Sequence, residues 1–171
     1  MRAVLRFVDD PGDWSTALRT GTVSPATWYA AAGAQRVVDL KARVCDHITG
    51  PDVDAAIARW QRLLTPHLDA HVDGWRDLEW GDDVRLYRYP VGGFFGPHVD
   101  TSPPEKRRVH TVVHCLQAPT SGGELIIHNT KEKFEYCAGE VMIFPSKLVH
   151  SAAPVLAGDK VVVVGWLASA L

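Results

Sequence analysis

The chain has 171 residues, of which 46% are hydrophobic and 22% charged, and its formal net charge is −2. This length can bury a core but leaves little room for a second one, so we predict a single domain over residues 1–171. The near-neutral charge gives no overall attraction to nucleic acid or to an anionic membrane surface, and neither is predicted as a partner. The oligomeric state is left open.

The ends of the chain give no sign of export or membrane insertion. The N-terminal segment loses its apolar character at Asp9 and Asp10, before the core of a signal peptide could form. The most apolar run, residues 161–171, is about half the ~20 residues that a membrane-spanning helix needs. The three cysteines are odd in number and lack paired spacing, which is typical of reduced thiols. We therefore expect a cytoplasmic protein and a buried strand at residues 161–171.

The residues before Pro51 carry a weak pattern. The segment SPATW, residues 24–28, resembles a helix start. Residues 27–44 are expected to hold a short helix and a strand.

A clear amphipathic pattern follows. Apolar residues recur every three or four positions between Pro51 and Trp75, which is typical of a helix with one buried face. Pro51 followed by Asp52 suits the first helical turn. Pro66 is expected to kink or divide the helix because it lacks a backbone donor, and Gly74 is expected to end it.

After Trp80 the periodicity becomes that of strands. Eight short apolar or alternating runs are separated by segments rich in Gly, Pro, Asn, Asp or Ser. The runs are VRLYRY, FFGPHVD, HTVVHCL, GELIIH, KFEYC, EVMIF, LVHSA and KVVVVGWL. This spacing predicts a jelly roll, also called a double-stranded β-helix. We therefore predict a mainly β fold, with a jelly-roll core at residues 81–171 and a mainly helical support at residues 1–80 packed on the major sheet.

Three His-x-Asp triplets, a spacing used at several iron sites, occur at residues 67–69, 71–73 and 98–100. On a helix, residues i and i+2 point to opposite sides, so the first two triplets would splay apart. On a strand they point to the same side. Only His98 and Asp100 are therefore predicted to converge on one metal ion.

Two downstream residues can complete the site. A centre with two histidines and one carboxylate needs a second histidine, and His150, late in the strand-rich half, is the natural candidate. Ten residues further on, Lys160 opens a valine-rich strand, where a lone ammonium group is unfavourable unless it meets an anion. A dicarboxylate held by the metal at one end and by Lys160 at the other would supply that anion.

These residues lie within a longer series of motifs. The series runs YPVGGFFGPHVD, RVHT, GGE and GEVMIFPSKLVHSAAPVLAGDK, followed by Trp166. It resembles the Fe(II)- and 2-oxoglutarate-dependent dioxygenases, and among them the prolyl 4-hydroxylase-like branch. The resemblance covers about residues 85–167.

The resemblance implies a role for each matching position. The iron ligands and catalytic centre would be His98, Asp100 and His150. The 2-oxoglutarate contacts would be Lys160 at the distal carboxylate, with Tyr89 and Thr111 nearby. The substrate pocket would include Phe95, Trp166 and, as a fourth histidine near iron, His114. For Tyr89, Phe95 and Trp166 a plain place in the barrel core stays open, and for His114 a packed histidine.

The resemblance also implies the chemistry. Fe(II), 2-oxoglutarate and O2 would hydroxylate an unactivated C–H bond and yield succinate and CO2. The substrate would be amino-acid-like, of proline type, free or within a short peptide. The basic residues 106–108 either clamp a substrate carboxylate at the pocket mouth or form a solvated turn.

Two other classes of protein stay open. A cupin-like metal enzyme that does not use 2-oxoglutarate would make Lys160 incidental. A non-catalytic jelly-roll binding module would make the histidines structural.

Overall fold

The computed structural model describes residues 3–6, 14–26, 28–29, 36–37, 41–81, 83–101 and 107–170. The helices are α1 (Trp14–Thr20), α2 (Pro51–Leu68) and a 3₁₀ turn (Trp75–Asp77). The strands of the first half are β1 (Ala3–Arg6), β2 (Thr22–Pro25), β3 (Trp28–Tyr29), β4 (Arg36–Val37), β5 (Arg43–Val44), β6 (Asp46–Thr49) and β7 (Leu78–Trp80). The strands of the second half are β8 (Arg85–Tyr89), β9 (Phe94–His98), β10 (Arg108–Gln117), β11 (Ser121–Gly122), β12 (Leu125–Ile127), β13 (Glu132–Phe134), β14 (Glu140–Pro145), β15 (His150–Ala152), β16 (Val155–Ala157) and β17 (Lys160–Ser169).

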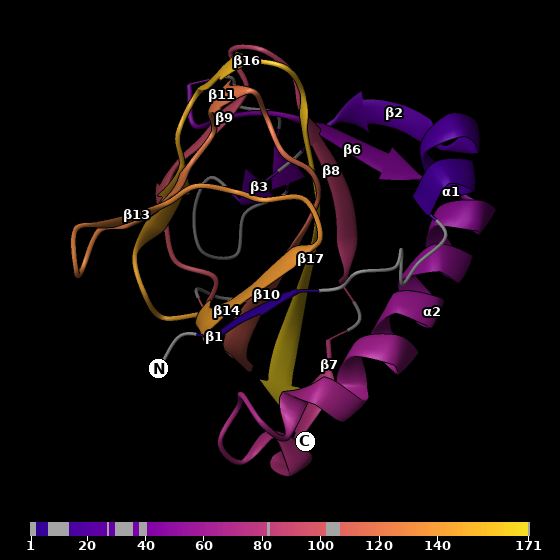
Figure 1. The fold of residues 1–171 in the computed structure, drawn as a ribbon, viewed down its shortest axis with the longest axis vertical. Helices are drawn as coiled ribbons and strands as arrows, with labels where there is room; N and C mark the ends of the chain where they lie inside the picture. The colour runs from indigo at the N-terminus through magenta and orange to yellow at the C-terminus, as the bar shows by residue number, and fades with distance from the viewer. Residues whose placement is uncertain are drawn as a thin grey trace.

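Two antiparallel sheets carry the fold. The larger sheet has the order β1-β14-β10-β17-β8-β6-β2, with β7 pairing to the end of β17. The smaller sheet has the order β13-β12-β15-β9-β5 and lies on the side away from α2 (Figure 1). Apolar side chains from both sheets form one cluster, in which Val113 and Phe144 of the larger sheet are joined by Leu125 and Ile127 of the smaller one. This arrangement confirms the predicted jelly roll.

Helix α2 covers the outer face of the larger sheet (Figure 1). Its buried face carries Trp60, Leu64 and Leu68, which are inaccessible to solvent and pack with sheet residues such as Leu86 and Val112. The 3.6-residue repeat of apolar positions thus places one stripe of the helix against the sheet. The prediction that helices pack on the major sheet is confirmed.

Strand β17 is covered on both faces. Val161 and Val163 belong to the cluster under the helices, whereas Val162 belongs to the cluster between the sheets. Because side chains alternate across a strand, a strand buried on both sides has no polar face and reads as a continuous valine run. The strand predicted there is confirmed.

All eight strands predicted after Trp80 are present, as β8, β9, β10, β12, β13, β14, β15 and β17. Two more were missed: β11 and β16, which pair with each other. Both lie in segments whose Gly, Pro and Ser content predicted turns, and Gly122 in β11 has a positive φ of 75°. A two-residue pairing of this kind depends on a distant partner, which local composition does not reveal.

The helix predicted over residues 51–75 is shorter than expected. It ends at Leu68, whose carbonyl accepts the backbone N–H groups of His71 and Val72 in a turn. Pro66 lies within the last turn of α2 and does not divide it. The turn after Leu68 folds back onto the core and buries Val72. For this reason the apolar repeat continues in the sequence past the end of the helix. The triplet at residues 71–73 is therefore in a turn.

The N-terminal half contains more strand than expected. The helix start predicted at residues 24–28 is wrong, because Ser24 and Pro25 belong to β2, which pairs with β6. Most of residues 27–40 lie outside the described residues. Helices α1 and α2 do form a support, but β1, β2, β6 and β7 of the same half extend the larger sheet. None of the helices in the described ranges combines the length and apolar character required to cross a bilayer.

Candidate active site

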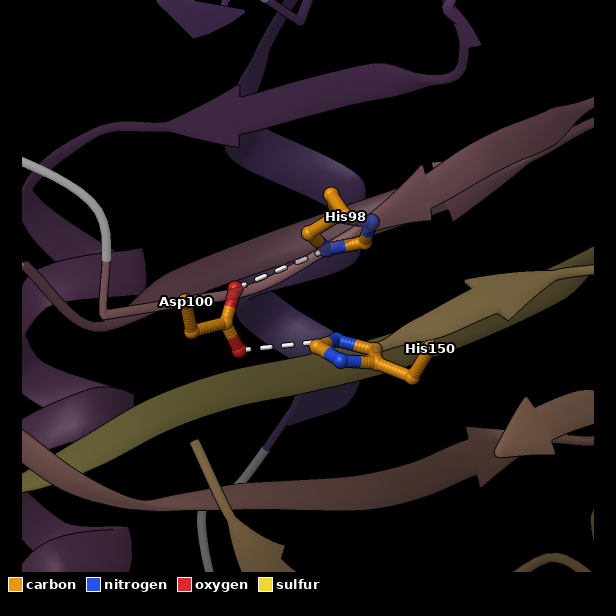
Figure 2. Close-up of side chains that lie close together, drawn as sticks. All are labelled: His98, Asp100 and His150. Carbon is orange, nitrogen blue, oxygen red and sulfur yellow. Dashed lines mark ion pairs between the residues drawn. The ribbon is translucent and has the colours of Figure 1, made fainter. Parts of the chain in front are cut away.

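His98 and His150 lie opposite each other on neighbouring strands of the smaller sheet. They are direct partners in the antiparallel register of β9 and β15, and their ring centroids are 4.2 Å apart. Asp100 follows the end of β9, and its carboxylate oxygens lie 3.5 Å from Nε2 of each histidine (Figure 2). One ligand atom from each of the three residues lies within 4.8 Å of the others. The three side chains thus converge on one point from two strands.

Backbone carbonyls fix the orientation of both imidazole rings. Nδ1 of His98 lies 2.9 Å from the Gly96 carbonyl oxygen, and Nδ1 of His150 lies 2.9 Å from that of Leu148. Since a carbonyl only accepts, each Nδ1 carries the proton and each Nε2 presents a lone pair. Burial lowers the pKa of His150 to about 4, although the Asp100 carboxylate opposes the shift, so this ring is neutral at pH 7.

Thr111 and Ser146 hold Asp100 in place beside the two histidines. The Thr111 hydroxyl donates to Oδ2 at 2.6 Å and lies 3.0 Å from the Ser146 hydroxyl, while the Asp100 backbone N–H donates to the Ser146 carbonyl. Burial alone would raise the pKa of Asp100. Interactions with His98 and His150 and the hydrogen bond from the Thr111 hydroxyl outweigh burial and hold that pKa well below its usual range. Asp100 is therefore a carboxylate at neutral pH.

A cavity of about 280 Å³ opens onto this cluster. All three residues of the cluster line it, together with Thr111. Its apolar walls include Val113, Leu125 and Val162. The cavity thus joins the metal-binding geometry to a space that can hold small organic molecules.

Lys160 lines the same cavity and is only 1% exposed. Its ammonium group donates to the Gly123 carbonyl at 2.7 Å and lies over the rings of Tyr89 and Tyr136, at 4.4 and 4.7 Å from their centroids. None of the carboxylates in the described residues pairs with it. Burial lowers the pKa of Lys160 to about 8, and the group is still mostly charged at pH 7.

The three aromatic residues singled out from the sequence also line the cavity. Tyr89 is the direct strand partner of Lys160. The Phe95 ring stacks on the His98 ring with centroids 3.7 Å apart. Trp166 is buried, and its indole N–H finds no acceptor among the described residues, so it can donate to a ligand oxygen.

His114 does not line the cavity, and its expected place in the substrate pocket is wrong. It lies on the other face of β10, fully buried, where its Nδ1 accepts a hydrogen bond of 3.1 Å from the Trp60 indole. Thr111 and Val113 occupy the cavity face of the same strand. Strand alternation places residue 114 on the helix side, so the packed-histidine alternative holds.

The charged residues of the cavity wall include one that sequence reasoning did not assign, Arg43, and one from the basic loop at residues 106–108. Arg43, from β5, is 7% exposed and lies in a segment whose composition carries no functional signal. Arg108, the last residue of the basic loop, is the one member of that trio that lines the cavity in the described part of the chain. It pairs with Asp83 at 3.0 Å and stacks on Trp166. Arg107 instead contacts Glu79 and the Ser169 carbonyl.

The chain matches a known family over its second half. The sequence model of the 2OG-Fe(II) oxygenase superfamily aligns with residues 84–168, a span that includes the histidine and aspartate cluster and Lys160. The chain belongs to this superfamily. Its metal is therefore Fe(II), and its cosubstrates are 2-oxoglutarate and O2. The superfamily is one of oxygenases.

Curated relatives of this superfamily member are PKHD-type hydroxylases. One from Prochlorococcus marinus (strain NATL1A) is 40% identical over 84 residues, which cover 46% of this chain and 38% of that protein. Another from Maricaulis maris (strain MCS10) is 33% identical over 91 residues, which cover 50% of this chain and 42% of that protein. The chain thus spans less than half the length of the curated relatives it matches.

Solved structures show the same fold over nearly all of the chain. A prolyl-4-hydroxylase of Pseudomonas putida superposes with a TM-score of 0.72 at 19% identity, covering 99% of this chain and 92% of that one. A prolyl hydroxylase of Trichoplax adhaerens, in complex with a peptide fragment of the hypoxia inducible factor oxygen degradation domain, gives 0.74 at 16% identity, covering 98% and 83%. The fold is therefore that of the prolyl hydroxylase-like members.

Proposed function

We propose that this protein hydroxylates a C–H bond of an amino-acid-like substrate of proline type, free or within a short peptide. His98, Asp100 and His150 hold Fe(II), and Lys160 binds the distal carboxylate of 2-oxoglutarate. The observation that carries the proposal is that one cavity is lined both by the three-residue cluster and by the buried Lys160, which pairs with none of the described carboxylates.

The donor set fits Fe(II). Two imidazole nitrogens and one carboxylate on one side of a metal ion leave the remaining positions for a chelating cosubstrate and oxygen. The carbonyls behind His98 and His150 and the hydroxyl behind Asp100 supply the outer contacts that orient such ligands. When bound, the iron with 2-oxoglutarate and O2 supplies the oxidation that replaces C–H by C–OH and releases succinate and CO2.

The residues of the chain have separate tasks in this scheme. The Lys160 ammonium and the Tyr89 ring beside it hold and orient one end of the cosubstrate. Thr111 keeps the Asp100 carboxylate in place by donating its hydroxyl proton to Oδ2. The apolar walls exclude water, and Phe95 and Trp166 position the substrate, which decides the C–H bond that reacts.

Support for a proline-type substrate comes from the relatives. The curated relatives are described as hydroxylases, and two of the structural neighbours as prolyl hydroxylases. The cavity volume of about 280 Å³ accommodates the cosubstrate and a small side chain or free amino acid, which favours a small substrate over a large protein partner.

The test is production of succinate by the iron-loaded protein in air. Each member of a panel of free amino acids, L-proline among them, and proline-containing dipeptides is added in turn, and substrate-stimulated succinate is measured. The proposal predicts stimulation by at least one member and its loss in Lys160→Ala. The matched control is Lys147→Ala, because Lys147 is exposed on the loop after β14.

Each alternative gives a different result. Metal-dependent turnover that survives Lys160→Ala without 2-oxoglutarate indicates a cupin-like enzyme. A folded protein that takes up no Fe(II) indicates a non-catalytic module.

A further inference from the structure

Arg43 places a buried positive charge in the cavity wall. It lies on the edge strand β5, paired with Phe95 of β9, and is 7% exposed. Its side chain lines the cavity together with the metal-binding cluster. The first half of the chain thus contributes a charged group to a site otherwise built from the second half.

The contacts of Arg43 leave its charge uncompensated. Nε donates to the Cys45 sulfur at 3.0 Å, and Cζ lies over the rings of Tyr87 and Phe95, at 4.1 and 4.3 Å from their centroids. None of these groups is an anion at neutral pH, and no described carboxylate pairs with Arg43. A guanidinium group stays protonated, so burial without an anion is unfavourable unless a ligand supplies one.

Among the arginines whose burial the structure describes, Arg43 is the one that is at least partly buried and pairs with no carboxylate. Five arginines of the described residues pair with a carboxylate within 3.0 Å: Arg76, Arg85, Arg88, Arg107 and Arg108. Arg43 is more buried than any of these five arginines, and it contacts two aromatic faces where they contact a carboxylate. Aromatic faces attract a cation and fix the plane of the guanidinium, which leaves its terminal N–H groups for a planar, two-oxygen anion.

The charges of the proposed complex assign that anion. Fe(II) bound by Asp100 carries one net positive charge, and Lys160 carries a second. The two negative charges of 2-oxoglutarate balance these. Of the three arginines of the cavity wall, Arg85 and Arg108 share the Asp83 carboxylate, and Arg43 pairs with no described carboxylate. Arg43 and Lys160 lie over different rings: Arg43 lies over Tyr87 and Phe95, the ring that stacks on His98, and Lys160 lies over Tyr89 and Tyr136, while the Cys45 thiol interacts with both cations.

We propose that Arg43 binds the carboxylate of the substrate, and that the substrate is therefore a free amino acid rather than an internal residue of a peptide. This inference rests on the proposed function and narrows its substrate class. A guanidinium group and a carboxylate form two parallel hydrogen bonds, which fix the orientation of the substrate as well as its affinity.

The first arm of the test uses the unaltered iron-loaded protein. Substrate-stimulated succinate is compared for matched pairs, L-proline with L-prolinamide and each other amino acid of the panel with its amide, and for N-acetyl-L-prolinamide as the mimic of an internal residue. We expect the carboxylates to stimulate turnover, and each active carboxylate to exceed its amide by about 100-fold in kcat/KM, because the amide leaves a buried charge unpaired.

The second arm uses Arg43→Gln, with Arg43→Lys as the charge-retaining variant. Arg88→Gln is the matched control, because Arg88 pairs with Asp46 on the neighbouring strand and does not line the cavity. In Arg43→Gln we expect KM for the carboxylate substrate to rise about 100-fold, with partial recovery in Arg43→Lys. Affinity for 2-oxoglutarate, measured without oxygen by the visible absorption of the Fe(II) complex, is expected to stay within about twofold.

The outcomes separate this inference from the proposed function. Absence of the anaerobic absorption band in the unaltered protein contradicts the proposed function. A normal band with equal stimulation by acids and their amides, or with stimulation by amides alone, contradicts the role of Arg43 alone. If Arg43→Gln loses as much 2-oxoglutarate affinity as Lys160→Ala, the proposed substrate contact is overturned, because Arg43 then binds the cosubstrate. Should Arg43→Gln not fold, the comparison of acids with amides decides.

Discussion

His98 and His150 are partners in adjacent antiparallel strands, and each directs Nδ1 to the carbonyl two residues before it, in both cases at 2.9 Å. The two strands therefore present two Nε2 lone pairs to one point with the same tautomer. Asp100, two residues after His98, completes the cluster. The metal site is thus built by strand pairing, and backbone carbonyls orient its two histidines.

The hydrogen bond from Thr111 to Asp100 predicts a role in metal affinity. Thr111→Val removes the donor at Oδ2 and should weaken Fe(II) binding by about 10- to 100-fold, the range typical for loss of an outer contact. Thr111→Ser keeps the hydroxyl and should bind nearly as well as the unaltered protein. Anaerobic titration with Fe(II) measures both, and equal affinity in Thr111→Val would show that Asp100 is held by other contacts.

The buried charge of Lys160 should lower the free energy of unfolding of the apoprotein, although it favours binding of 2-oxoglutarate. Its pKa in the folded protein, about 8, lies below the unfolded value of 10.5, so protonation favours unfolding as the pH falls from about 10.5 through about 8. Lys160→Met should therefore raise the free energy of unfolding of the apoprotein at pH 7 by roughly 1–2 kcal/mol. Urea unfolding measures this change. Addition of 2-oxoglutarate with a metal should stabilise the unaltered protein more than the variant, and a less stable variant would contradict the account.

The same group predicts a pH dependence of cosubstrate binding. Protonated Lys160 attracts the distal carboxylate, and burial sets its pKa at about 8 in the ligand-free protein. Affinity for 2-oxoglutarate should be constant near pH 7 and fall by up to about tenfold per pH unit above 8. This is checked by measuring the 2-oxoglutarate affinity between about pH 6.5 and about pH 9.5, a range that brackets the pKa of Lys160. In Lys160→Arg any remaining affinity should lose this decline, because arginine stays charged, and an unchanged decline would assign the titration elsewhere.

The buried pair of Trp60 and His114 predicts an effect on stability alone. Trp60→Phe removes the donor to Nδ1 of His114 and leaves a smaller ring between α2 and the sheet, which should cost about 2–4 kcal/mol. Fe(II) affinity and the KM for substrate should stay unchanged, because both side chains lie on the far side of β10 from the cavity. If Trp60→Phe left the stability unchanged but altered the KM for substrate, His114 would have to be assigned to the substrate pocket after all.

Sequence reasoning succeeded where the geometry follows from strand alternation. His98 and Asp100 were predicted to share a side because they lie two apart at a strand end, and the structure brings them within 3.5 Å. Lys160 was singled out because an ammonium group in a valine-rich strand needs an anion, and it lines the same cavity as the cluster. Local rules were sufficient for both.

Other features depended on information that the local sequence lacks. The resemblance places His114 in the pocket as a fourth histidine near iron, but its position on β10 directs its side chain to Trp60. The apolar repeat past Leu68 predicted more helix because Val72 is buried by a turn, which periodicity does not distinguish. Arg43 went unassigned because its partners Tyr87 and Phe95 are more than 40 residues away in the chain.

The central claim is that His98, Asp100 and His150 bind one Fe(II) that also holds 2-oxoglutarate. The direct measurement is the visible charge-transfer absorption formed when Fe(II) and 2-oxoglutarate are added without oxygen. The account predicts a band in the unaltered protein, its loss in Asp100→Ala, and its retention in Asp73→Ala, which alters the same triplet sequence in an exposed turn. No band in the folded, unaltered protein, or an undiminished band in Asp100→Ala, would contradict it.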